Sequence, residues 1–270
     1  MLKFISFGSG SSGNCYFLFT QTEGLMIDAG IGIRLVKKYF REYGLTLPAV
    51  RHILVTHNHT DHVKAVGYLS EELHVPVYAT RAVHTGIDAN YCVHKKVPLA
   101  YKKCIVPGET CELGGFRITP FMVPHDSIEN VGYCVQTQGR TFCVITDAGS
   151  VTEEMREYIG KADYLVIESN YDEQMLQCGK YPAYLKKRIS GSCGHLSNNE
   201  CTKTVVEHKG ENLKKVWLCH LSEENNHPEL ARKTVEQILR SYGIVAGKDF
   251  MLEVLKRKTP SEIYTLKATE

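Results

Sequence analysis

The stretch that decides the fold is residues 56–62, which read Thr-His-Asn-His-Thr-Asp-His. It follows a strand-like run, and alternate residues of an extended segment point the same way. His57 and His59 can therefore aim at one point as the chain leaves a sheet. A turn into a helix would let Asp61 and His62 face a neighbouring point. Imidazole nitrogens and carboxylate oxygens suit Zn²⁺, Mn²⁺ or Fe²⁺, so this stretch predicts a metal site.

Four other apolar runs also end in a side chain that can bind a metal. These end residues are Asp28, His125, Asp147 and His220. His195, which lies in a Gly/Ser-rich loop, competes with His220 for the last ligand position. Because His220 follows a strong strand-like run, we expect it to be the ligand and His195 to be free for catalysis.

Composition limits the classes to which the chain can belong. Its 270 residues are 43% hydrophobic and 23% charged, with a formal net charge of +2. These values exclude disordered and fibrous classes and a strongly basic nucleic-acid coat. No stretch approaches the roughly 20 apolar residues of a membrane helix, and the N-terminus does not resemble a signal peptide. The ten cysteines have no CxxC spacing, so we expect reduced thiols in a cytoplasmic protein.

Short β-branched and apolar runs predict many strands with helices between some of them. The expected strands are 3–7, 14–19, 24–28, 52–56, 75–78, 103–106, 115–123, 131–137, 141–146, 163–168, 215–219 and 250–255. The expected helices are 33–40, 62–73, 152–159, 197–208 and 228–241. This pattern favours sheets packed face to face with helices outside, in a single domain over residues 1–270.

The order and context of these residues resemble the five motifs of the metallo-β-lactamase superfamily, over residues 3–255. The resemblance implies an α/β protein, an αββα four-layer sandwich of two mixed sheets flanked by helices. It also implies a two-metal site at one edge of the sheets. The first metal would be held by His57, His59 and His125, and the second by Asp61, His62 and His220, with Asp147 bridging. Asp28 would support the site through hydrogen bonds to the ligands.

Two metal ions about 3.5–4 Å apart can hold a hydroxide that attacks an electrophile such as phosphorus. Four segments, 8–14, 56–62, 194–198 and 220–226, resemble the YycJ/WalJ-type exonucleases. The resemblance implies a metal-dependent hydrolase, a phosphodiesterase that removes DNA in the 5′-to-3′ direction. In this interpretation Asp61 orients the nucleophile and His195 donates a proton to the leaving oxygen.

Substrate contacts are less sharply indicated. Backbone N–H groups and hydroxyls of loop 8–14, which includes Ser12 and Asn14, could cradle a phosphate, although a tight turn explains the glycines equally well. Residues 169–194 form the least regular segment, a candidate lid or substrate-facing loop, and they contain a basic run at 186–188 and several tyrosines. Such tyrosines can stack on unpaired bases or belong to the core.

The same ligands also fit two other functions. One is a hydrolase of a small thioester or lactone, and the other is a regulatory module that binds metal only for stability. Metal identity, DNA against RNA, end polarity and oligomeric state are not fixed by the residues. Two divalent ions per chain, Zn²⁺ or Mn²⁺ with Fe²⁺ also fitting, and a nucleic acid, with DNA favoured, are the expected partners.

Overall fold

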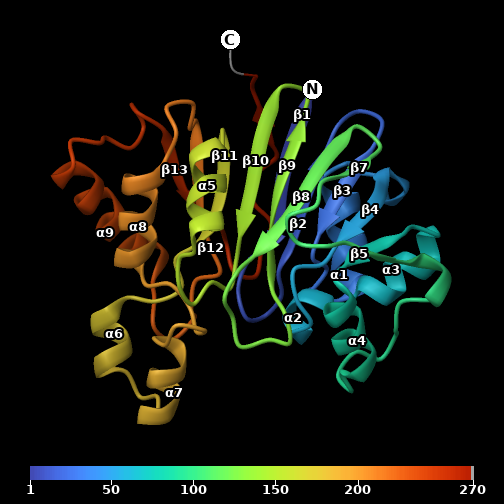
Figure 1. Cartoon of the computed structure of the whole chain (residues 1–270), viewed down its shortest axis with the longest axis horizontal. Coiled ribbons are helices and arrows are strands. Elements are labelled where there is room, and N and C mark those ends of the chain that lie inside the picture. The colour runs from blue at the N-terminus through green and yellow to red at the C-terminus, as the bar shows by residue number, and fades with distance from the viewer. Residues whose placement is uncertain (269–270) are drawn as a thin grey trace.

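Two seven-stranded sheets form the centre of the molecule (Figure 1). The computed structural model describes residues 1–268, so the last two residues of the predicted 1–270 domain lie outside the described part of the chain. The first sheet contains, in spatial order, β14 (Tyr264–Leu266), β1 (Leu2–Gly8), β2 (Cys15–Phe19), β3 (Gly24–Ile27), β4 (Val50–Leu54), β5 (Val77–Ala79) and β6 (Lys102–Cys104). The second contains β13 (Met251–Val254), β12 (Lys215–Cys219), β11 (Tyr164–Glu168), β10 (Arg140–Ile145), β9 (Val131–Thr137), β8 (Phe116–Met122) and β7 (Cys111–Leu113).

Both sheets are mixed in the same way. Strands β14, β1, β2 and β3 pair antiparallel, whereas β3, β4, β5 and β6 pair parallel. In the second sheet β7 to β10 are antiparallel and β10 to β13 are parallel. The prediction of two mixed sheets is therefore confirmed.

Helices cover the outer face of each sheet (Figure 1). The helices of the described chain are α1 (Ile33–Glu42), α2 (Thr60–Val63), α3 (Val66–Leu73), α4 (Arg81–Ala89), α5 (Glu153–Lys161), α6 (Glu173–Cys178), α7 (Ala183–Ile189), α8 (Asn198–His208) and α9 (Pro228–Ser241), with 3₁₀ turns at Leu47–Ala49 and Leu99–Tyr101. In Figure 1, α5, α8 and α9 lie on one side of the paired sheets, and α1, α3 and α4 lie on the other. This arrangement gives the four layers of the predicted αββα sandwich.

Three apolar layers hold the sandwich together. Successive residues of a strand face opposite sides, so Phe4 packs between the sheets while Ile5 packs under the helices of the first sheet. In β10, Val144 packs between the sheets and Cys143 packs under the helices of the second. Because both faces of each sheet are buried, its central strands are continuous apolar runs, which made them recognisable in the sequence.

Side chains at the first residues fix several helix starts. Thr152 accepts a hydrogen bond from the Met155 backbone at the start of α5. Ser197 and Glu200 form a capping box at the start of α8. Pro228 occupies the first turn of α9, where its missing N–H costs nothing.

The structure differs from the predicted elements in three places. The predicted helix 62–73 is broken into α2 and α3, because the backbone N–H of Ala65 donates to Ala29 outside the helix. The segment 169–194 is not irregular, since it contains α6 and α7. The edge strands β7 and β14 and the helix α4 had no counterpart among the predictions.

Three loops are joined by backbone hydrogen bonds at the edge where β3 and β4 end. Asn14 donates to the Asp61 carbonyl at 2.7 Å, Gly30 donates to Asn14 at 2.8 Å, and Ala29 donates to His62 at 2.8 Å. A Cβ atom on Gly30 would lie 1.5 Å from the Asp61 carbonyl oxygen. Gly30 therefore permits the approach that places the 56–62 stretch against the first two loops.

Among the helices of residues 1–268, none has the length and apolar character needed to cross a membrane.

We expect Gly30→Ala to lower the thermal unfolding midpoint by about 6–12 °C, or about 3 kcal/mol, because the added methyl group overlaps backbone that cannot move freely. Thermal unfolding of the purified variant measures this loss. Gly32→Ser is the matched control, since a Cβ at Gly32 meets nothing within 4 Å and serine is a good residue at the start of a helix. Equal midpoints for the two variants would contradict the packing argument.

Candidate metal centre

The candidate site is built from residues at the exits of strands. Asp28 follows β3, Asp147 follows β10 and His220 follows β12. All three have positive φ values, of 57°, 55° and 53° respectively. Residues other than glycine rarely adopt this conformation, and it persists where the surrounding structure enforces it. Each of the three side chains contacts other residues of the candidate site.

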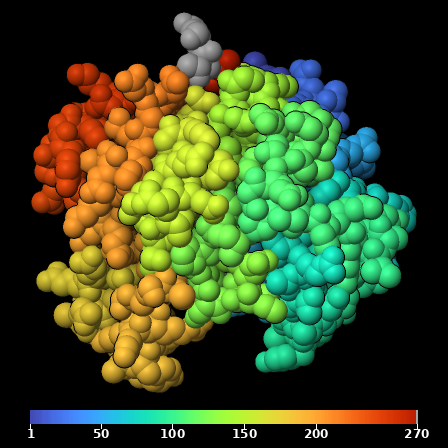
Figure 2. All heavy atoms as spheres, in the orientation of Figure 1, coloured from blue at the N-terminus to red at the C-terminus, as the bar shows by residue number. Residues whose placement is uncertain are grey.

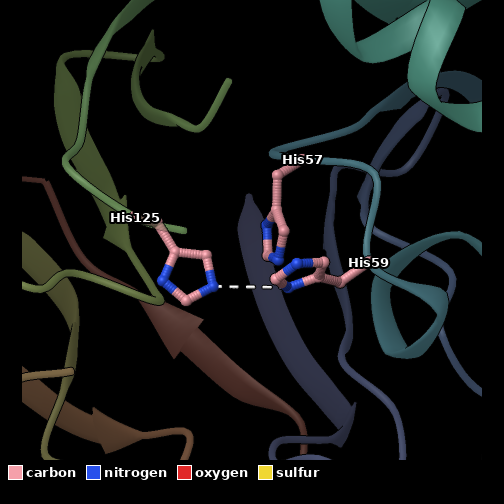
Figure 3. A group of neighbouring side chains, drawn as sticks. All are labelled: His57, His59 and His125. Carbon is pink, nitrogen blue, oxygen red and sulfur yellow. Dashed lines mark hydrogen bonds between the residues drawn. The ribbon is translucent and has the colours of Figure 1, made fainter. Parts of the chain in front are cut away.

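One group of imidazoles consists of His57, His59 and His125 (Figure 3). One ring nitrogen of each lies within 4.8 Å of those of the other two. Nε2 of His125 is 3.3 Å from Nδ1 of His59, and Nε2 of His57 is buried without a hydrogen-bond partner. Three converging nitrogens, one of them without a partner, are what a divalent cation requires.

A second group consists of Asp61, His62 and His220. Nε2 of His62 and Nε2 of His220 each lie 3.7 Å from Oδ2 of Asp61. Nε2 of His220 is also buried without a hydrogen-bond partner. This group offers two nitrogens and one carboxylate.

Asp147 lies between the two groups. Its Oδ2 is 3.2 Å from Nε2 of His62, and its Oδ1 is 3.8 Å from Nε2 of His125. The hydroxyl of Thr146 donates to Oδ2 at 2.6 Å, and the Asn130 amide donates to the Asp147 carbonyl at 2.9 Å. One carboxylate therefore presents an oxygen to each group.

Asp28 contacts Thr56 and His62, two residues of the 56–62 stretch. The Thr56 backbone N–H donates to its Oδ1 at 2.8 Å, and the Thr56 hydroxyl donates to its Oδ2 at 2.9 Å. Nδ1 of His62 is 2.7 Å from the same Oδ2. With Nδ1 bonded in this way, the other ring nitrogen of His62 is the one directed at Asp61 and Asp147.

Sequence reasoning missed Glu168. This residue orients His195 and His220, as Asp28 orients His62. Its Oε1 is 2.9 Å from Nδ1 of His195 and 2.8 Å from Nδ1 of His220. Its Oε2 accepts the backbone N–H groups of Ala148 at 2.8 Å and Leu196 at 3.2 Å. Glu168 ends the apolar strand β11, so the strand-end signal that identified Asp147 was present here too.

His195 lies beside both groups and is more open than His220. Its ring centroid is 5.1 Å from that of His125 and 5.4 Å from that of His220. Its side chain is 18% exposed, against 5% for His220. Burial opposes protonation of His195, but the adjacent Glu168 carboxylate outweighs it and raises the pKa of this imidazole.

The carboxylates set the electrostatics of the site. Burial lowers the pKa of His57 well below its usual value. Burial acts in the same direction on His62 and His220, but Asp28 raises the pKa of His62 well above the usual value, and Asp147 raises that of His220 to about 10. Burial opposes ionisation of Asp147, yet His220 and His62 hold its pKa well below the usual range. The acids thus create a field that stabilises positive charge.

The two predicted substrate-binding residues lie in different settings. Ser12 is exposed on loop 8–14. Asn14 is fully buried, and its amide nitrogen is 2.8 Å from Nε2 of His62 and 3.4 Å from Oδ2 of Asp61. Asn14 therefore contacts the site from inside the protein rather than from solvent.

Known proteins resemble this chain over most of its length. A family model described as a β-lactamase superfamily domain matches residues 24–220. Exodeoxyribonuclease YycJ of Bacillus anthracis is 32% identical over 262 residues, covering 97% of this chain and 98% of that protein. Exodeoxyribonuclease WalJ of Streptococcus pneumoniae is 33% identical, covering 92% of each chain.

Solved structures show the same fold at lower identity. The metallo-β-lactamase fold protein YhfI of Bacillus subtilis has a TM-score of 0.71 at 17% identity, covering 97% of this chain and all of that one. The short form of human tRNase Z has a TM-score of 0.63 at 16% identity, with 97% and 100% covered. The chain therefore belongs to the metallo-β-lactamase superfamily of hydrolases and, within it, to the YycJ/WalJ family.

Proposed function

We propose that this protein is a divalent-metal-dependent phosphodiesterase that acts as a 5′-to-3′ exonuclease on DNA. The observation that carries the proposal is the pair of ligand groups joined by Asp147, with His195 held beside them by Glu168. The names of the YycJ and WalJ relatives, which this chain matches over more than nine-tenths of its length, support DNA as the substrate. The expected location is the cytoplasm, in keeping with ten cysteines that are all thiols here.

The donor set fits two divalent cations, Zn²⁺ or Mn²⁺ by its nitrogen and oxygen chemistry. The residues that would hold them are His57, His59 and His125 on one side, Asp61, His62 and His220 on the other, and Asp147 between. When bound, such a pair activates water at neutral pH and neutralises charge on the phosphate oxygens. The partnerless Nε2 atoms of His57 and His220 support this assignment, because buried nitrogens without partners are costly.

The chain's own groups would provide orientation and a proton. The Asp61 side chain is 24% exposed, whereas that of Asp147 is 3% exposed. Asp61 can therefore bind a metal ion and also orient an attacking water molecule. His195 is the proposed proton donor to the leaving sugar oxygen. Glu168 is a positioning residue, because it accepts from Nδ1 of His195 and leaves Nε2 as the nitrogen available to substrate.

We expect His59→Ala and Asp147→Ala to lose bound metal and to reduce cleavage of end-labelled DNA to the level of metal-stripped protein. Elemental analysis and gel assays with Zn²⁺ or Mn²⁺ restored measure both properties. His94→Ala, at an exposed histidine, is the matched control and should retain both. Full activity of Asp147→Ala would rule out the shared-carboxylate arrangement.

We expect His195→Ala to retain its metal while cleavage slows by about 10²–10⁴-fold, the usual contribution of a general acid. His220→Ala, by contrast, should lose metal. Metal analysis of the two variants side by side separates the roles. Loss of metal from His195→Ala with retention in His220→Ala would exchange the two assignments.

We expect Glu168→Gln to lower activity by about 10–100-fold, because the amide NH2 that replaces one carboxylate oxygen cannot accept: either the two imidazoles or the backbone N–H groups of Ala148 and Leu196 lose their acceptor. Single-turnover rates and metal titrations measure the effect. Glu207→Gln, on the exposed face of α8, serves as the control. Wild-type rates for Glu168→Gln would mean that the two histidines are oriented without this carboxylate.

A further inference from the structure

The loop between β1 and β2 contacts every residue of the second ligand group. The Asn14 amide nitrogen is 2.8 Å from Nε2 of His62 and 3.4 Å from Oδ2 of Asp61. Nearer the start of the loop, the Ser9 hydroxyl accepts the backbone N–H of His220 at 2.9 Å. In the part of the chain that the structure describes, no hydrogen bond joins this loop to the first group of imidazoles. The loop therefore distinguishes the two groups.

Ser9 and Asn14 are joined through the hydroxyl of Tyr16, the second residue of β2. Oγ of Ser9 is 2.8 Å from the Tyr16 oxygen, and the Tyr16 hydroxyl donates to Oδ1 of Asn14 at 3.4 Å. All three residues are fully buried. On the face drawn in Figure 2, the first residues of the chain, coloured blue, are visible only at the upper right rim. Solvent therefore does not compete for these hydrogen bonds.

The hydrogen bonds between these side chains run in one direction. The Tyr16 hydroxyl donates to Asn14, so the Ser9 hydroxyl is the donor to Tyr16. Ser9 in turn accepts from the His220 N–H. The Gly10 backbone N–H donates to Oδ1 of Asn14 at 2.9 Å, which turns the NH2 group of the amide toward the ligands. Hydrogen bonds in such a chain polarise one another, so a change at one end weakens the other.

The backbone donors of this loop are bonded within the protein. The Gly13 N–H donates to the Gly10 carbonyl at 2.8 Å, and the Gly10 N–H donates to the Asn14 side chain. The Asn14 N–H donates to the Asp61 carbonyl at 2.7 Å. A phosphate cradle needs free N–H groups. These contacts favour a role in holding the ligands over a role as a phosphate cradle.

Asp61 is the member of the second group that most needs support. Its side chain is 24% exposed, whereas those of His62 and His220 are 0% and 5% exposed. Buried carboxylates already orient both histidines through Nδ1. Among the described residues, Asn14 is the only neutral side chain that contacts the Asp61 carboxylate. Without this contact, a partly exposed carboxylate is free to rotate away from the site.

We propose that Ser9, Tyr16 and Asn14 form a positioning chain that sets the affinity of the second ligand group for its metal ion and leaves the first group unaffected. This inference rests on the proposed two-metal function and deepens it. The positioning chain fixes the Asp61 carboxylate and the His220 backbone in advance, so less ordering is needed when an ion binds. A protein with a broken positioning chain retains one ion and loses the other.

The test titrates metal-depleted protein with Mn²⁺ and Zn²⁺ by calorimetry and counts bound ions by elemental analysis. Ser9→Ala and Asn14→Ala should each raise the Kd of the second group by about 10- to 100-fold, the usual cost of removing a partner of a metal ligand, with the Kd of the first group unchanged. Tyr16→Phe removes one hydroxyl and keeps the ring, so about a 5-fold increase is expected. The binding event that weakens in His59→Ala belongs to the first group.

DNA cleavage provides a second readout. At a metal concentration that fills only the first group, Ser9→Ala and Asn14→Ala should not cleave end-labelled DNA, and added metal should restore cleavage. A general loss of structure would not be rescued in this way.

Ser70→Ala and Tyr164→Phe are the matched controls. Each removes a buried hydroxyl that donates to a backbone carbonyl away from the ligands, and both variants should bind two ions with wild-type affinity. Thermal unfolding shows which variants are folded. If Asn14→Ala does not fold, Ser9→Ala and Tyr16→Phe carry the test.

The outcomes separate this inference from the proposed function. Unchanged affinities in the folded variants, or equal weakening of both groups, would overturn the positioning chain and leave the nuclease proposal standing. A wild type that binds two ions, loses one in the variants and cleaves no nucleic acid would overturn the nuclease proposal and support the positioning chain. A wild type that binds no second ion would overturn the positioning chain together with the two-metal arrangement.

Discussion

The candidate site depends on holding several imidazoles close together at one edge of the sandwich. The ring centroids of His57 and His62 are only 4.1 Å apart, and those of His59 and His125 are 5.0 Å apart. Such rings repel one another when protonated and leave nitrogens without partners when neutral. Asp28 and Glu168 resolve half of the problem, because each buried carboxylate accepts from Nδ1 of a histidine. The Nε2 atoms of His57 and His220 remain buried without a protein partner, and a cation would satisfy them.

Packing of the sandwich stabilises this crowded arrangement of side chains. Its three apolar layers fix the strands, so the strand exits can adopt the unfavourable positive φ values of Asp28, Asp147 and His220. Backbone hydrogen bonds between loop 8–14, residues 28–30 and the 56–62 stretch then hold the exits of the first sheet in register. The second sheet uses side chains for the same purpose, since the Asn226 amide donates to the carbonyls of Ser169 and Asn170 behind Glu168.

Much of the fold could be predicted because strands buried on both faces leave continuous apolar runs. The three-residue strands β7 and β14 lie at sheet edges and leave no such run. Helix α4 was hidden by Gly86, which weakens a helical pattern but is required because a Cβ there would lie 2.7 Å from the Asn58 side chain. Four of the seven candidate ligands came from the 56–62 stretch and three from strand ends, and the structure brings all seven together. Glu168 was missed because nothing in one sequence tells which strand-end acids lie at the same edge.

Two of the helices that local patterns did not predict, α4 and α7, are bonded to loops that carry candidate ligands. Helix α7 has no fully buried residue, and α4 carries Gly86 among its buried residues. The Asn90 amide donates to the Asn58 carbonyl, and Arg188 donates to the Asp126 carboxylate. Helices α4 and α7 are therefore fixed to the ligand loops by direct hydrogen bonds.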